Sequence, residues 1–217
     1  MKMRVISTGF SPPGGGSALA ASLAAQVGAE FEHRLVDAAT QTPPRACPDN
    51  LLMLASDLAT EDIIVWVDLD DELCDTQAIA RIEQAHAKGA WLTYGSFRYG
   101  DGRVGIAAPY RRHESVRTSP WRLTHLKSFR AGLLHRIKPE HLKRDGVWID
   151  RAVDMALMMP MAEMAGHDRC TFMPQVMLTY AFQHSFEWNA SPKELSREKE
   201  LDAWVRGLPP YERLESL

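Results

Sequence analysis

The chain has 217 residues, of which 45% are hydrophobic and 24% are charged, and its formal net charge is -3. This composition supports one folded domain of generous size rather than a disordered chain. The lack of a basic excess argues against a nucleic-acid partner, and no apolar run is long enough to predict a transmembrane segment. The three cysteines form no C-x-x-C pair and the charged start has no apolar signal region, so we expect a cytoplasmic protein.

The first hundred residues predict a parallel α/β sheet. Apolar patterns favour strands at 4–8, 32–37, 63–67 and 90–97, and helices at 17–27, 50–58 and 75–88. The 63–67 segment is a continuous run of β-branched and aromatic residues, as expected for a strand buried on both faces. Ligands of such sheets bind beyond the carboxyl ends of the strands, which is where Thr8, Asp37 and Asp68 fall.

The second half is less regular. Residues 150–165 predict a helix that Pro160 kinks or breaks, and residues 172–182 predict two strands joined by a turn. Near the end, Ser191 and Glu194 have the spacing of a capping box around Pro192. They predict a helix that stops at Gly207.

The sequence Asp68-Leu69-Asp70-Asp71-Glu72 places four carboxylates in five positions directly after the strongest strand. Carboxylates crowded at a sheet edge repel one another unless a cation neutralises them. Their hard oxygens suit Mg²⁺ or Mn²⁺. The alternative is a solvated acidic turn, which the position after a buried strand disfavours.

The acidic motif and its surroundings resemble the family 2 glycosyltransferases of the GT-A class. The resemblance covers residues 3–185 and is carried by an ordered series of segments: Val5 to Thr8, Leu19 to Val27, Leu35 to Asp37, Glu61 to Leu73, Leu92 to Phe97, Trp121 to Arg130 and Asp154 to Gly166. It implies a single GT-A-type α/β domain, with a mostly parallel central sheet flanked by helices. Residues 1–100 would form the nucleotide-binding half, 101–185 the acceptor half and 186–217 a C-terminal helical extension.

The resemblance also implies an activity, namely metal-dependent hexosyl transfer from a nucleotide-diphosphate sugar to a hydroxyl on a glycan or other acceptor, with inversion. Asp70 would be the direct ligand of Mn²⁺ or Mg²⁺. Asp68 would bind the ribose or hold a metal-bound water, and His184 would complete the metal shell. Thr8 and Asp37 would line the base and ribose pocket. The chain departs from the family at Ala38, where many members have a second acidic residue.

Two carboxylates are candidates for the base that takes the acceptor proton. Asp150 and Asp154 are four residues apart, so on one helix they would share a face. Their mutual repulsion would raise one pKa, which suits a base. The resemblance favours Asp154.

A basic stretch follows the predicted sheet strands, and Arg122 and His125 within it are candidates for binding the donor diphosphate. The alternative is a solvated helix face. The methionines between Met155 and Met164 predict core packing or a face for a second subunit, and with the C-terminal helix they suggest a homodimer.

Two other functions fit the acidic motif. In a haloacid-dehalogenase-like phosphatase, Asp68 would be the nucleophile and Asp70 the acid/base, with a downstream lysine close to Asp68. Glu72 departs from that motif, which also normally lies nearer the N-terminus. The third hypothesis is a non-catalytic nucleotide- or sugar-binding module, which Ala38 supports.

Overall fold

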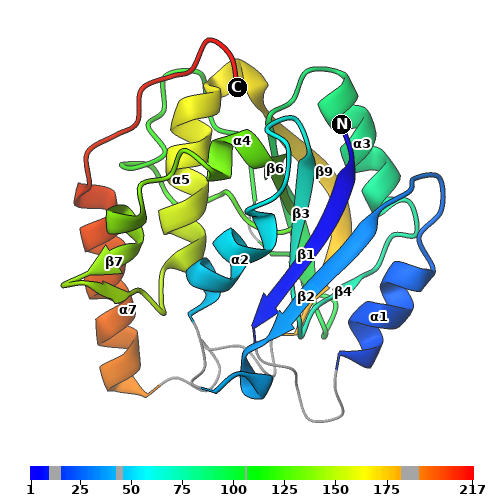
Figure 1. The fold of residues 1–217 in the computed structure, drawn as a ribbon, viewed down its shortest axis with the longest axis horizontal. Coiled ribbons are helices and arrows are strands. Elements are labelled where there is room, and N and C mark those ends of the chain that lie inside the picture. Colours follow the sequence, from blue (N-terminus) through cyan, green and yellow to red (C-terminus); the bar gives the residue numbers. More distant parts are fainter. Residues whose placement is uncertain (10–15, 43–45, 106, 182–190) are drawn as a thin grey trace.

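The computed structural model describes residues 1–9, 16–42, 46–105, 107–181 and 191–217, and shows a twisted sheet with helices on both faces (Figure 1). The sheet has seven strands in the order β2-β1-β3-β6-β5-β9-β4. Their bounds are β1 Met3–Gly9, β2 Glu32–Asp37, β3 Ile63–Asp68, β4 Glu72–Leu73, β5 Leu92–Tyr99, β6 Lys127–Arg130 and β9 Cys170–Tyr180. Strands β7 (Lys143–Arg144) and β8 (Val147–Trp148) form a separate hairpin.

The helices are α1 Ser17–Ala24, α2 Cys47–Ala55, α3 Ala78–Ala87, α4 Ala131–Leu134, α5 Val153–Ala165 and α7 Pro192–Gly207. Short 3-10 turns lie at η1 Ala38–Thr40, η2 Pro139–Leu142 and η3 His167–Arg169. Helices α1 and α3 cover one face of the sheet, and α2, α5 and α7 lie on the side of the other (Figure 1). The strands β1, β2, β3, β5 and β9 run in one direction, while β6 and β4 run against them. The predicted mostly parallel sheet is therefore confirmed.

The side chains of β1 and β3 point alternately to the two faces of the sheet and contribute to a hydrophobic core on each face. Ile6, Ile64 and Trp66 face the α2 and α5 side, while Val5 and Val65 belong to the cluster beneath α1 and α3. All five are buried. Because successive side chains of a strand point to opposite faces, a continuous apolar run fills both layers at once.

One strand was not predicted, and two local expectations were wrong. Strand β6 lies in the basic stretch, and its four residues carry charges at both ends, so no apolar run marks it. Residues 172–182 do not form two strands, because β9 is continuous to Tyr180 and the register shift opposite Gly95 to Phe97 replaces the turn. Helix α5 begins at Val153 rather than at residue 150 and is not broken at Pro160.

The methionines of α5 are core residues. Met155, Met158, Met159, Met161 and Met164 are all at most 8% exposed. They therefore provide no face for a second subunit, and the expectation of a homodimer loses this support. Dense burial of the helix also explains why α5 tolerates an internal proline, since tertiary packing can outweigh helix propensity.

The capping box predicted for the last helix is confirmed. Ser191 caps α7 by accepting from the Glu194 backbone N–H, and the Glu194 carboxylate accepts from the Ser191 N–H. Leu201 and Val205 of α7 are buried in the same core as α5. A boundary between a main domain and an extension at residues 185 and 186 stays a prediction.

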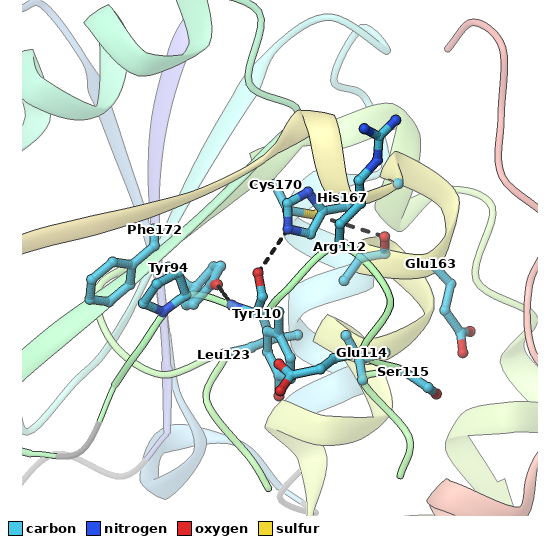
Figure 2. Close-up of a pocket in the computed structure, with 14 residues that line it drawn as sticks. Tyr94, Tyr110, Arg112, Glu114, Ser115, Leu123, Glu163, His167, Cys170 and Phe172 are labelled. Atoms are coloured by element: carbon cyan, nitrogen blue, oxygen red, sulfur yellow. Dashed lines mark hydrogen bonds between the residues drawn. The ribbon is translucent and has the colours of Figure 1, made fainter. Parts of the chain in front are cut away.

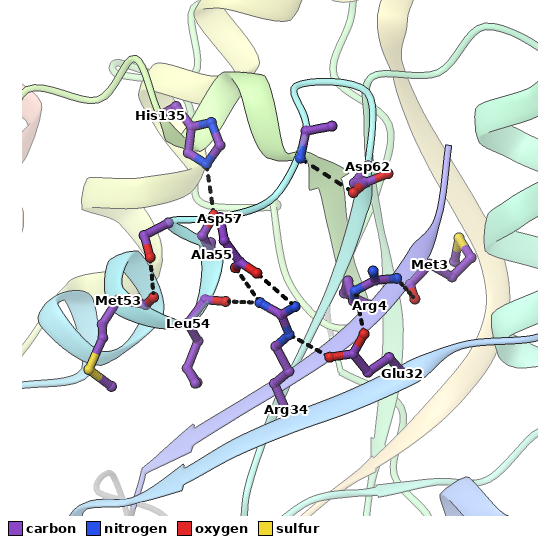
Figure 3. Close-up of polar contacts among 12 residues, drawn as sticks. Met3, Arg4, Glu32, Arg34, Met53, Leu54, Ala55, Asp57, Asp62 and His135 are labelled. Atoms are coloured by element: carbon purple, nitrogen blue, oxygen red, sulfur yellow. Dashed lines mark hydrogen bonds and ion pairs between the residues drawn. The ribbon is translucent and has the colours of Figure 1, made fainter.

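The edge strand β2 is fastened to α2 by Arg34 (Figure 3). Its guanidinium donates to the Leu54 carbonyl at 2.9 Å and to the Asp57 carboxylate, and it also pairs with Glu32 on its own strand. Hydrogen bonds to both side chains raise the pKa of Arg34. The contacts hold the sheet edge against the helix that precedes β3.

A cavity of about 280 Å³ lies beside α5, between the starts of β5 and β9 and the segment 109–123. Tyr94, Tyr110 and Phe172 contribute aromatic rings to its wall (Figure 2). Within the described residues, no helix has the length and apolarity needed to cross a bilayer.

Buried His86 makes stability depend on pH. It is 1% exposed, and Nε2 lies 2.8 Å from the Ser128 hydroxyl. Burial, together with the nearby positive charge of Arg130, lowers the pKa of His86 from 6.5 to about 4. Because the folded state binds this proton less readily than the unfolded state, His86 favours unfolding as the pH falls from 6.5 towards 4.

We expect protonation of His86 to lower the free energy of unfolding of the wild type by about 3 kcal/mol as the pH falls from 6.5 to 4. The variant His86→Gln keeps an amide donor for Ser128 and removes the titrating group, so its free energy of unfolding should fall less steeply with acid. Urea unfolding of both proteins between pH 7.5 and 4.5 measures the difference. Parallel curves would contradict the assignment.

Candidate functional site

The carboxyl ends of three neighbouring strands meet at one edge of the sheet. In the register, Thr8 of β1 is opposite Asp68 of β3 and next to Val36 of β2, and Gly9 is opposite Asp37. The expected convergence of Thr8, Asp37 and Asp68 is therefore observed. The Thr8 hydroxyl is buried and lies 3.0 Å from the Cys47 thiol. The Asp37 carboxylate accepts from the Ala39 N–H and caps η1.

The acidic motif forms a tight turn between β3 and β4. The Asp71 N–H donates to the Asp68 carbonyl at 3.2 Å, and β4 then pairs with the end of β9. Because the chain turns back into β4 at this point, the Asp71 side chain points inward and the residue is only 1% exposed. One carboxylate oxygen of Asp71 accepts from the Ala181 N–H at 3.0 Å.

Asp68, Asp71 and His125 bring potential metal-binding atoms within 4.8 Å of one another. The second Asp71 oxygen and His125 Nδ1 are buried, are 3.9 Å apart and have no hydrogen-bond partner in the described part of the chain. Burial raises the pKa of Asp71 well above its usual value and lowers that of His125 to about 3. Leaving such buried atoms unsatisfied is costly, and a cation between them would remove the cost.

The three side chains fit a divalent metal. Carboxylates suit Mg²⁺ and Mn²⁺, whereas an imidazole suits transition metals. This donor set therefore favours Mn²⁺ of the two predicted ions. Two aromatic rings hold His125 in place: the Tyr180 ring stacks on it with 5.2 Å between ring centroids, and the Phe97 ring makes an edge contact at 5.5 Å.

A buried lysine connects the acidic turn to α5. Lys127 of β6 is 0% exposed, and its ammonium donates to the Asp154 carboxylate at 2.9 Å and lies 4.0 Å from Asp68. The same ammonium lies 3.9 Å from the centre of the Trp66 ring. Two carboxylates and an aromatic face compensate a charge that burial alone would disfavour.

This arrangement sets the ionisation of the two carboxylates. Burial raises the pKa of Asp68 to about 7 against the opposing charge of Lys127, and the negative charges of Asp154 and Asp70 add to the rise. Burial would also raise the pKa of Asp154, but the charge and hydrogen bond of Lys127 lower it. The expected source of pKa tuning, repulsion between Asp150 and Asp154, is therefore wrong.

Asp150 and Asp154 do not share a helical face. Helix α5 begins at Val153, so Asp154 lies in its first turn and Asp150 precedes it. The Asp150 carboxylate pairs instead with Arg197 of α7 at 3.0 Å and is 45% exposed. Of the two candidate bases, only Asp154 is bonded to Lys127 beside Asp68.

The remaining predicted residues are more dispersed. Asp70 is half-buried in the acidic turn but is not one of the three grouped ligands. The Arg122 guanidinium pairs with Glu114 at 2.7 Å and lies over the Tyr110 ring. His184 lies outside the described residues. Sequence reasoning did not single out Asp71 or Lys127, although Asp71 belongs to the acidic motif.

No family model matches the sequence, and no curated protein matches it either. Solved structures of S. aureus TarS are similar in fold. TarS 1-349 in complex with UDP matches with a TM-score of 0.60 and 17% identity, over 94% of this chain and 65% of that chain. Its complex with UDP-GlcNAc matches with a TM-score of 0.64 and 13% identity over the same shares.

A further TarS structure matches with a TM-score of 0.63 and 16% identity, over 94% of this chain and 39% of that one. The chain thus spans less than two thirds of each of these three TarS chains. The predicted GT-A-type fold is confirmed. The acidic turn lies at the carboxyl ends of the parallel strands, where sheets of this kind bind their ligands.

One Asp71 oxygen has no hydrogen-bond partner among the described residues, and this predicts a stabilising substitution. In Asp71→Asn, the remaining oxygen still accepts from the Ala181 N–H, while a carboxyl group whose ionisation burial and Asp68 oppose is replaced by a neutral amide. We expect the variant to gain about 1–3 kcal/mol of unfolding free energy at pH 7 in the presence of a chelator. Asp101→Asn, at an exposed ion pair with Arg103, is the control. Urea unfolding that ranks Asp71→Asn below the wild type would contradict this.

Proposed function

We propose that the protein is a metal-dependent glycosyltransferase that moves a hexosyl group from a nucleotide-diphosphate sugar to a hydroxyl acceptor, with inversion. One observation carries the proposal: the acidic turn, His125 and the Lys127–Asp154 pair gather at the carboxyl end of β3. The GT-A-type fold supports it, as do the UDP and UDP-GlcNAc complexes of TarS.

In this proposal, Asp68, Asp71 and His125 hold a divalent cation. When bound, the cation would supply positive charge that stabilises the diphosphate leaving group. Asp70, in the same turn, and His184 remain proposed as ligands from the family resemblance. Thr8 and Asp37 would contact the base and ribose, and Arg122 the diphosphate. The inward turn of Asp71 favours it over Asp70 for direct binding.

Asp154 is the proposed general base. Its carboxylate is about one third exposed, so an acceptor hydroxyl can reach it. Lys127 lowers its pKa and keeps it ionised near neutral pH, ready to accept a proton. A lowered pKa also makes it a weaker base, which the position of the acceptor must compensate.

The first test is binding of the donor nucleotide. Thermal unfolding is measured with UDP, GDP, ADP and CDP, each with Mn²⁺ or with chelator, using the wild type, Asp68→Asn and the control Asp101→Asn. One nucleotide should stabilise the wild type and the control only when Mn²⁺ is present, by about 2.7 kcal/mol at a hundredfold excess over its Kd. Asp68→Asn should lose this stabilisation.

Stabilisation by no nucleotide would contradict the proposal and lead to the phosphatase alternative. A specific observation supports that alternative, because it requires a downstream lysine close to Asp68 and Lys127 lies 4.0 Å away. Beryllofluoride, which mimics a phosphoryl group on a carboxylate, would then decide between the two remaining functions. Its binding to Asp68 would indicate a phosphatase, and no binding would indicate a non-catalytic module.

The second test separates the two candidate bases. Release of the nucleotide diphosphate from the donor by slow hydrolysis needs no knowledge of the acceptor. We expect Asp154→Asn to slow it by about 10²–10⁴-fold, because the attacking water loses its proton acceptor. Asp150→Asn, which removes a carboxylate paired with Arg197, should change the rate by less than about threefold. Equal effects of the two variants would refute Asp154 as the base.

A further inference from the structure

The cavity beside α5 is separate from the proposed catalytic site. Cys170 and Phe172 of its wall lie at the start of β9, and Tyr94 lies near the start of β5. Asp68 lies at the other end of β3, a strand that runs in the same direction as β5 and β9. The end of α5 closes the cavity with Ala162, whereas the start of α5 carries Asp154.

Aromatic and aliphatic side chains form most of the cavity wall. The ring centroid of Tyr94 lies 6.1 Å from that of Tyr110 and 5.6 Å from that of Phe172. Leu123 and Val116 also line the cavity. An apolar cavity of about 150 Å³ takes up benzene. A cavity of about 280 Å³ therefore has room for a larger flat ring system.

The polar atoms of the wall already bond to one another (Figure 2). The Tyr110 N–H donates to the Tyr94 hydroxyl at 3.0 Å, and Tyr110 donates its own hydroxyl to the Pro120 carbonyl. His167 Nε2 lies 2.8 Å from the Tyr110 carbonyl oxygen. A ligand held among these groups gains mainly from apolar contact rather than from new hydrogen bonds.

The charged groups around the cavity are paired, with one exception. Glu163 is bonded to Arg117 and Glu114 to Arg122. Arg112 is exposed, and within the described residues its guanidinium has no hydrogen bond or ion pair. The cavity thus combines an apolar interior with one available cation, which attracts an anion.

We propose that this cavity binds a small planar aromatic molecule that carries one carboxylate. The ring system lies among Tyr94, Tyr110 and Phe172, and the carboxylate pairs with Arg112. None of the cavity's lining residues belongs to the group Asp68, Asp71 and His125. Arg122, proposed above for the diphosphate, borders the cavity through its ion pair with Glu114.

The test uses 1-naphthoate and its neutral analogue 1-naphthamide, with affinities measured by calorimetry. Arg112→Gln should weaken binding of 1-naphthoate by about threefold to tenfold and leave 1-naphthamide unchanged. Arg111→Gln, which removes an equal charge one residue away, should change neither affinity by more than about twofold. Ala162→Phe, which fills the cavity, should abolish binding of both. Asp68→Asn should leave both affinities unchanged.

Methyl NMR of the wild type locates the ligand independently of any variant. We expect 1-naphthoate to shift the methyl signals of Val116, Leu123 and Ala162 and to leave that of Leu69, in the acidic turn, unchanged. Binding of neither compound, or shifts elsewhere with these methyls unmoved, would overturn the proposal. Equal affinity for both compounds, unaffected by Arg112→Gln, would overturn the role of the carboxylate.

Discussion

The buried ammonium group of Lys127 is the interaction on which the arrangement of the site depends. It joins the end of β3, the start of α5 and the short strand β6 through Asp68, Asp154 and the Trp66 ring. Removing one member of a buried ion pair usually lowers the free energy of unfolding by several kcal/mol, because the remaining charge is left buried without a counter-charge or solvent. The positions of both carboxylates are therefore coupled to correct insertion of β6 into the sheet.

Much of the fold could be predicted from local patterns. The apolar run of β3 predicts a strand, and the capping box at Ser191 predicts the start of a helix, each from only a few residues. Strand β6 could not be predicted in this way, because a lysine normally indicates a solvent-exposed position. Lys127 becomes buried only when the sheet has assembled around it. The site is similar in this respect, because the acidic motif marks its position in the sequence but not its geometry. The inward turn of Asp71 depends on pairing of β4 with the distant β9, and His125 packs against Tyr180 at the end of β9.

Function and stability place opposing demands on this edge of the sheet. Asp71 and His125 each keep a buried atom that has no hydrogen bond to any residue the structure describes. Such atoms lower stability in the absence of a ligand. The structure offsets such costs elsewhere, for example where Arg117 bonds Glu163 of α5 and the Val205 carbonyl of α7. Preorganised but unsatisfied polar groups are the usual condition of a site that binds charge.

The strand order has a consequence for synthesis of the chain. Strand β3 is complete at Asp68, yet its partner β6 begins only at Lys127, and β9, on the far side of β5, begins only at Cys170. A growing chain on the ribosome therefore carries one of its most apolar segments with an open edge while roughly sixty further residues are added. Such edges pair readily with other chains, so the interval before β6 emerges is when the growing chain is most exposed to wrong pairing.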